Sequence, residues 1–92
     1  MSNFYITRIT LIYNKNGDAM YLRIRDLRED YDLTQKQVSA YLLCDQSLYS
    51  KYERMERDLP LEFAIKLAEF YHVSLDYLVG MTDEKNPYPK RK

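Results

Sequence analysis

The sequence predicts an all-α fold of five short helices, preceded by a strand-like N-terminal extension. Apolar residues recur every three or four positions between residues 20 and 79, which is the spacing of helices that bury one face. Residues suited to helix caps, such as Thr34 and Ser74, stand before these segments. The chain has 92 residues, 46% of them hydrophobic, and only two glycines. One small domain with a helical core is therefore expected.

Residues 1–19 are interpreted as an extension that lies before the helical domain. Residues 3–13 are rich in β-branched and aromatic side chains, which favours a strand, and Asn16-Gly17 suits a turn. A lone strand needs a partner edge, such as its copy in a second subunit. Alternatively, Met20 is the native start and residues 1–19 are translated from upstream DNA. A purine-rich ribosome-binding sequence before codon 20 would be required for this second interpretation.

The first helix is predicted from about Met20 or Tyr21 to Asp30. Its apolar side consists of Leu22, Ile24, Leu27 and Tyr31. Its charged residues are expected on the outside, namely Arg23, Arg25, Asp26, Arg28 and Glu29.

Two short amphipathic helices follow, separated by a tight turn after Leu43. Thr34 is expected to cap the first of them and Asp45 the second. Four polar residues of the second helix are expected to face outward: Gln46, Ser47, Ser50 and Lys51. Two helices joined by a turn of about four residues form a helix-turn-helix, whose second helix can lie in a DNA major groove.

A fourth helix is predicted over residues 60–71 and should be the most buried, because apolar residues cover much of its circumference. A short fifth helix over residues 75–79 begins after Ser74 and ends at Gly80. The helical domain is therefore placed at residues 20–82. Residues 83–92 contain two prolines and end in Lys90-Arg91-Lys92, which is typical of a flexible basic tail.

The composition argues against several classes of protein and site. Cys44 is the single cysteine, so no internal disulfide can form, and one cysteine with one histidine does not suit a zinc site. No apolar run is long enough for a membrane span and no secretory leader is recognised, so a cytoplasmic protein is expected. No pair of carboxylates converges with a base or nucleophile. We therefore expect no enzyme activity, no cofactor and no metal.

The charge of the chain is unevenly distributed. The formal net charge is zero, but residues 20–83 hold 8 Lys and Arg against 12 Asp and Glu. Residues 84–92 hold four basic residues against Glu84 alone. This is not the basic footprint of a nucleic-acid binder driven by charge. Any DNA binding would depend on a few locally placed cations and on contacts to base edges.

Five motifs follow one another along the chain: Leu33-Thr-Gln-Lys-Gln-Val, Ser47-Leu-Tyr-Ser-Lys-Tyr-Glu-Arg, Pro60-Leu-Glu, Ile65-Lys-Leu-Ala and Val73-Ser-Leu-Asp-Tyr-Leu-Val-Gly. Together they resemble the Cro and phage-repressor helix-turn-helix family, the XRE-type family with the lambda-repressor-like fold. The resemblance covers about residues 20–82. It implies a five-helix DNA-binding domain. Many members are homodimeric transcriptional regulators of bacteria, phages and mobile elements, and others are antitoxins.

The resemblance implies that four residues of the second motif helix read base edges. Gln46 and Ser47 stand at the front of that helix, and Ser50 and Lys51 lie one turn further on the same face. The side-chain chemistry suits this role, because Gln can bond adenine N6 and N7, Lys can donate to guanine O6 and N7, and Ser is permissive.

Three further residues are implied to contact the DNA backbone or to support base contacts. Gln35 opens the first motif helix, where the family commonly touches a phosphate and supports the first base contact. Arg54 and Arg57 occupy the loop after the second motif helix, a common region of backbone contact.

The sequence departs from the family pattern at two positions where glycine is usual. Leu43 stands at the end of the first motif helix, and Met55 in the loop after the second. A positive φ is costly for both residue types, so the geometry of the turn is open at this point.

Two functions follow from these observations. The first is a transcriptional regulator, expected to be a repressor, that binds double-stranded DNA as a homodimer through residues 46–53. The alternative is an antitoxin or another protein-interaction module on the same fold, with a protein partner. The acidic balance of residues 20–83 motivates the alternative.

Overall fold

The computed structural model describes residues 22–89, and this part of the chain contains five α-helices and no strand. The helices are α1 (Ile24–Asp30), α2 (Gln35–Leu42), α3 (Gln46–Glu53), α4 (Leu61–Tyr71) and α5 (Leu75–Leu78). The all-α prediction with five helices is confirmed. The strand predicted at residues 3–13 and the alternative start at Met20 lie outside the described residues.

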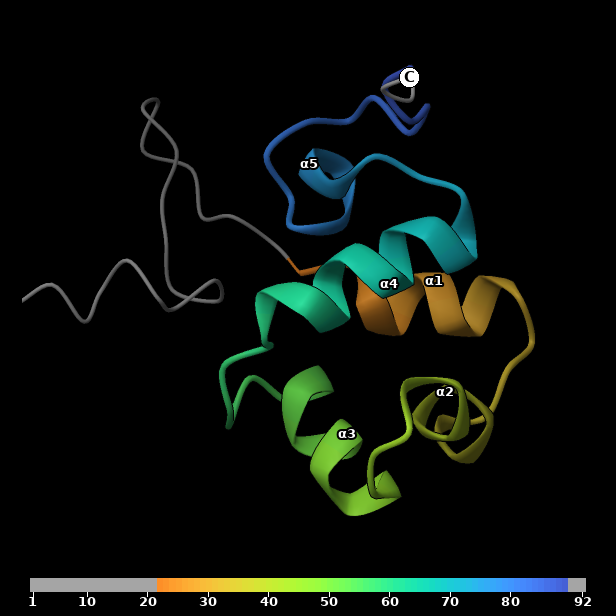
Figure 1. The fold of residues 1–92 in the computed structure, drawn as a ribbon, viewed down its shortest axis with the longest axis vertical. Helices are drawn as coiled ribbons and strands as arrows, with labels where there is room; N and C mark the ends of the chain where they lie inside the picture. Colours follow the sequence, from red (N-terminus) through yellow and green to blue (C-terminus); the bar gives the residue numbers. More distant parts are fainter. Residues whose placement is uncertain (1–21, 90–92) are drawn as a thin grey trace, which may run out of the picture.

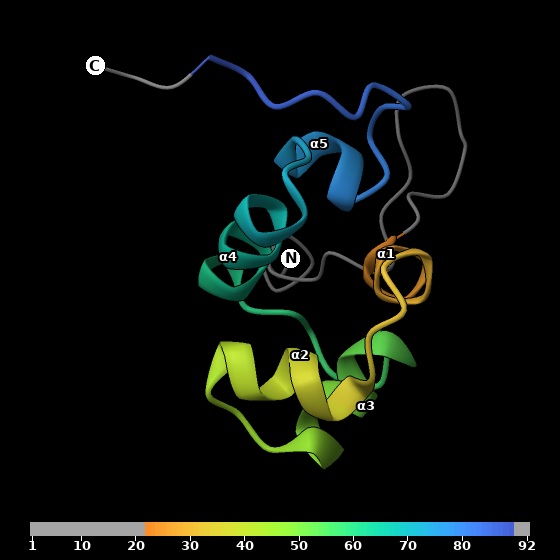
Figure 2. The same ribbon diagram turned by 90° about the vertical axis from the view of Figure 1, so that its right-hand side faces the viewer.

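The five helices are arranged around one core. Figures 1 and 2 show α2 and α3 together on one side of the domain, α5 on the opposite side, and α1 and α4 between them. The core takes residues from every helix and from the connecting segments. Its members are Leu22, Ile24, Leu27, Val38, Leu42, Tyr49, Tyr52, Leu59, Ala64, Leu67, Ala68, Tyr71, Val73 and Leu78.

Four tyrosines lie on α2, α3 and α4, and three of them pack in the core. Tyr49, Tyr52 and Tyr71 are buried in the core. Tyr41 instead keeps 41% of its surface exposed, and its ring packs on Phe70 with the centroids 4.5 Å apart. The tyrosines of the core are thus accounted for by packing.

The face that α4 buries is narrower than predicted. Ala64, Leu67, Ala68 and Tyr71 are buried, which is the spacing of a single helix face. Three apolar residues beside that face remain exposed: Leu61, Ile65 and Phe70. The prediction rested on the large apolar part of the helix surface, and the sequence does not show which part of that surface the neighbouring helices cover.

Side-chain caps fix the start of α2 and α5 but not of α3. The Thr34 hydroxyl accepts a bond from the Gln37 amide at 3.1 Å, and the Gln37 side chain accepts one from the Thr34 amide at 2.8 Å. Ser74 accepts a bond from the Tyr77 amide at 3.0 Å. Asp45 occupies the cap position of α3, but its side chain makes no cap bond to any described residue. The predicted cap chemistry is therefore confirmed at two of these three positions.

The helix α1 begins later than predicted. Arg23 is its N-cap residue, and the Arg23 amide donates to the Leu78 carbonyl at 2.9 Å. This bond ties the chain entering α1 to the end of α5, so Leu22 and Arg23 lie outside the helix.

The turn between α2 and α3 keeps the left-handed geometry even though it lacks glycine. Leu43 has φ 60° and ψ 42°, and Cys44 donates its amide to the Ser39 carbonyl at 3.0 Å. Met55, in the loop after α3, has φ 62°. His72 has φ 58° at the end of α4, as expected for a polar residue at a helix end. Leu43 and Met55 therefore both take the positive φ for which glycine is usual.

Residues 82–88 run along α5. Ser74 donates its amide to the Lys85 carbonyl at 2.8 Å and its hydroxyl to the Glu84 carbonyl at 3.1 Å. Tyr88 donates its hydroxyl to Asp76 Oδ2 at 2.7 Å. The mobility predicted for residues 83–92 stays a prediction, and Lys90-Arg91-Lys92 lie outside the described residues.

Candidate nucleic-acid interface

The exposed side of α3 and the start of α2 form one shallow hollow. On its inner side α3 buries Tyr49 and Tyr52, and Leu48 is partly buried against the core, so the opposite side faces solvent. Six of the seven predicted DNA-binding residues line the hollow: Gln35, Gln46, Ser47, Ser50, Lys51 and Arg54. Arg57 is exposed but is not one of the lining residues. The fold thus brings together residues from two helices that the sequence separates.

A buried carboxylate connects the first three helices beneath this hollow. Glu53, at the end of α3, has a side chain that is only 2% exposed. Arg28 of α1 binds both of its oxygens, from Nε at 2.7 Å and from Nη2 at 3.1 Å. Gln35 of α2 donates Nε2 to the same carboxylate at 3.0 Å. Arg28 also donates Nη1 to the Leu33 carbonyl at 2.9 Å, which fixes the entry to α2.

The environment of Glu53 favours its ionised form. Burial by itself acts to raise the pKa of Glu53, but interactions with Arg28, Tyr49 and Gln35 outweigh burial and lower it. The Tyr49 hydroxyl acts on the carboxylate electrostatically, although it makes no hydrogen bond of normal geometry to any described residue. Burial is the main cause that raises the pKa of Tyr49 well above its ordinary value, and the Glu53 carboxylate is the next largest. The Tyr49 hydroxyl therefore stays protonated.

The expectation that all charged residues of α1 face outward was wrong for Arg28 and Arg23. Their side chains are 14% and 19% exposed. Arg23 packs over the Tyr77 ring at 4.1 Å and donates to Asp83 at 3.0 Å. Each guanidinium reaches a partner far along the chain, and such partners cannot be inferred from helical spacing. The ion pair predicted within α1, between Arg25 and Glu29, is confirmed at 3.3 Å.

Lys51 and Arg54, the two cations of the hollow, differ in their ion pairs. Lys51 is exposed and has no ion pair within residues 22–89. Arg54 is bound by Glu56 through two bonds, from Nε at 2.8 Å and from Nη2 at 3.1 Å, and its Nη1 donates to the Ser50 hydroxyl. Sequence reasoning assigned no role to Glu56. Glu56 lies only two residues after Arg54 and in a loop, so no helical spacing of the two residues predicted their contact.

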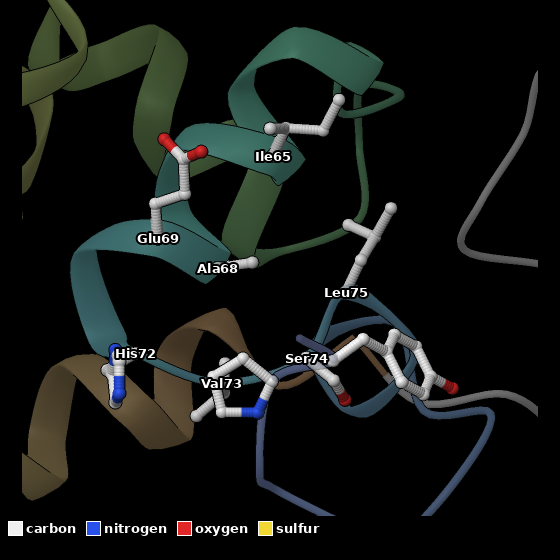
Figure 3. Close-up of a pocket in the computed structure, with 9 residues that line it drawn as sticks. Ile65, Ala68, Glu69, His72, Val73, Ser74 and Leu75 are labelled. Atoms are coloured by element: carbon white, nitrogen blue, oxygen red, sulfur yellow. The ribbon is translucent and has the colours of Figure 1, made fainter. Parts of the chain in front are cut away.

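A second hollow, which involves no residue of α2 or α3, is mainly apolar. It lies between α4, the start of α5 and the C-terminal segment, and Figure 3 shows Ile65, Glu69 and Leu75 around it. His72 and Tyr88 also line it.

The described residues contain no group of His, Cys, Asp or Glu that could hold a metal ion. Cys44 is half-buried and packs against the core, and burial raises the pKa of its thiol.

Comparisons with known proteins agree with this geometry. A sequence profile described as helix-turn-helix matches residues 24–78. The chain belongs to the helix-turn-helix family. The resemblance seen in the sequence is thereby confirmed, and the profile spans all five helices of this family member. Within residues 22–89, no helix has the length and apolar character needed to cross a membrane.

Two relatives come from Bacillus subtilis. The chain is 37% identical over 70 residues to the uncharacterized HTH-type transcriptional regulator YobD, covering 76% of this chain and 62% of the relative. It is 36% identical over 58 residues to the HTH-type transcriptional regulator ImmR, covering 63% of this chain and 46% of the relative. The chain therefore spans less than two thirds of the length of these relatives. No solved structure gives a significant match.

Proposed function

We propose that this chain binds double-stranded DNA as a transcriptional regulator, with α3 in the major groove. The observation that carries this proposal is the single hollow in which the start of α2 and the exposed side of α3 present six polar residues. The family match and the transcriptional regulators among the relatives support it. A helix presented on the surface by a second, supporting helix is the arrangement that fits a major groove.

The lining residues have the chemistry for reading base edges. Gln46 and Ser47 are exposed in the first turn of α3, where the amide of Gln46 can bond adenine N6 and N7. Lys51 is exposed one turn further on and can donate to guanine O6 and N7. Gln35 donates Nε2 to Glu53, which holds its side chain in place. Its proposed role is therefore to support the neighbouring contacts to DNA. Arg57 is proposed as a backbone contact at the edge of the surface.

The proposed form is a homodimeric repressor on an inverted repeat. A two-fold axis would place two recognition helices in successive major grooves, about 34 Å apart. Phe70 is 40% exposed and is proposed as part of the subunit contact, whereas the nearby apolar residues Tyr77 and Val79 are partly buried within the domain. A sedimentation measurement with and without a palindromic duplex would test this form.

Two substitutions test the DNA-binding surface. Gln46→Ala and Lys51→Ala should each weaken binding to a duplex enriched by in vitro selection by about 1–3 kcal/mol, because each removes a base-edge contact. Lys66→Ala on α4 is the charge-matched control, because Lys66 is also exposed but lies outside the hollow. The Lys66→Ala variant should bind the selected duplex with an affinity close to that of the wild type. Unchanged binding by both test variants would contradict the proposed surface.

The alternative function, an antitoxin or another protein-interaction module, is favoured by the acidic balance of residues 20–83. A stoichiometric protein partner that co-purifies with the chain, together with no duplex binding at low salt, would support this alternative over DNA binding.

A further inference from the structure

Arg54 and Glu56 form a two-point pair beside the DNA-binding hollow. Arg54 is the C-cap residue of α3, and its Nε and Nη2 donate to the two oxygens of Glu56 at 2.8 Å and 3.1 Å. Its Nη1 donates to the Ser50 hydroxyl. Every nitrogen of the guanidinium therefore already has a partner within the chain. A phosphate group would use the same pair of parallel donors.

The loop after α3 holds Glu56 in position for this pair. Met55 takes the left-handed conformation, with φ 62°, and the Glu56 amide donates to the Lys51 carbonyl at 2.9 Å. The chain therefore folds back over the last turn of α3, at the start of the loop toward α4 in Figure 1. These bonds place the backbone of Glu56 next to the end of α3, within reach of Arg54 for its carboxylate.

Glu56 also offsets the charge of the hollow. Arg54 and Lys51 are the two cations among the lining residues, and both lower the pKa of Glu56, Arg54 more than Lys51. The carboxylate therefore remains ionised at neutral pH. An incoming phosphate would meet this negative charge as well as the two positive charges.

We infer that Glu56 competes with the DNA backbone for Arg54, so that Arg54 is withheld from DNA in the free protein. This inference rests on the proposed function, because it concerns the same surface. A withheld Arg54 lowers the sequence-independent part of the affinity. Base contacts by residues such as Gln46 then carry a larger share of binding, which suits a domain with an acidic balance.

Glu56→Gln is the test, measured by titration with a random-sequence duplex over a range of salt concentrations. Release of Arg54 should tighten binding roughly three- to tenfold at low salt and make the slope of log affinity against log salt steeper by about one. Glu29→Gln is the matched control, because Glu29 forms an exposed pair with Arg25 on α1. It removes the same charge and should stay within about twofold of the wild type.

A second background separates competition from simple repulsion. In Arg54→Ala, the added Glu56→Gln substitution should give only the small gain that comes from losing the repulsion between Glu56 and phosphate, because the side chain for which Glu56 competes is gone. The inference is overturned if Glu56→Gln matches Glu29→Gln in affinity and slope. It is also overturned if the gain from Glu56→Gln is as large in the Arg54→Ala background as in the wild type. A wild-type chain that binds neither selected nor random duplex at low salt would instead contradict the proposed function, and this inference with it.

Discussion

Glu53 joins three helices through one buried carboxylate. Its bonds to Arg28 and Gln35 link α3 to α1 and α2, and so they hold these three helices together. Replacing a buried charge by a neutral group leaves its partner uncompensated, which is more costly than losing an exposed pair. The single residue therefore supports both the stability of the domain and the shape of the hollow.

Glu53→Gln should lower the free energy of unfolding by about 3 kcal/mol, because Arg28 would remain mostly buried without a negative partner. Urea denaturation followed by circular dichroism would measure the change. Glu29→Gln breaks an exposed Arg–Glu pair on α1 and should cost no more than about 0.5 kcal/mol. Equal losses in the two variants would contradict the structural role of the buried pair.

The same carboxylate should make stability dependent on pH in the acid range. The pKa of Glu53 is lowered in the folded protein from its ordinary value of 4.5. Its stabilising contribution is therefore complete above the unfolded pKa and is lost as the pH falls through the folded pKa. The unfolding free energy of the wild type should fall between about pH 6 and about pH 3 by more than that of Glu53→Gln. Parallel pH curves for the two proteins would contradict this assignment.

At the scale of secondary-structure elements, the turn between α2 and α3 shows how the fold overrides a local preference. Leu43 holds a left-handed conformation that costs a residue with a Cβ atom about 1–2 kcal/mol. The Leu43 side chain is 87% exposed, so its packing offsets little of this energetic cost. The bonds from the Leu43 and Cys44 amides to the last turn of α2, together with the burial of both helices, keep the turn in this conformation.

Leu43→Gly should therefore stabilise the domain by about 0.5–1 kcal/mol, after allowing for the greater flexibility of glycine in the unfolded chain. Leu43→Ala keeps the Cβ atom and serves as the control, with a stability close to that of the wild type. Thermal unfolding of the three proteins gives the comparison. A Gly variant that is no more stable than the Ala variant would show that the left-handed turn carries no strain.

The sequence predicted the existence and order of the helices because periodicity and caps are local signals. The Thr34 capping box and the Ser74 cap belong to this class. The start of α1 was misplaced because Arg23 is held by Leu78, a residue far along the chain. The exposure of Leu61 on α4 was missed for a related reason, since coverage by neighbouring helices is a property of the assembled fold.

At the scale of the whole molecule, the candidate site was predicted in part. The family resemblance pointed to the residues on the outer side of α3, and the fold gathers six of the seven predicted residues in one hollow. The buried Arg28–Glu53 pair and the Arg54–Glu56 pair were not predicted. Each depends on how a loop or a distant helix places a charge, and neither leaves a periodic pattern in the sequence.

We propose that this acidic domain reads DNA mainly through base edges, with few cations available for the backbone. Lys51, Arg54 and Arg57 supply the positive charge on and beside α3. Sequence-independent attraction should therefore be weak, and most of the affinity should depend on the matched sequence.

The most direct measurement is a salt titration of the wild-type chain with a selected duplex and with a random duplex of equal length. The selected duplex should bind at least about 10³-fold more tightly. The slope of log affinity against log salt should be no steeper than about −2 per protomer, because Glu56 holds Arg54 and leaves Lys51 and Arg57 as the remaining cations on and beside α3. Equal affinity for the two duplexes, or no binding to either, would contradict recognition of DNA bases by α3.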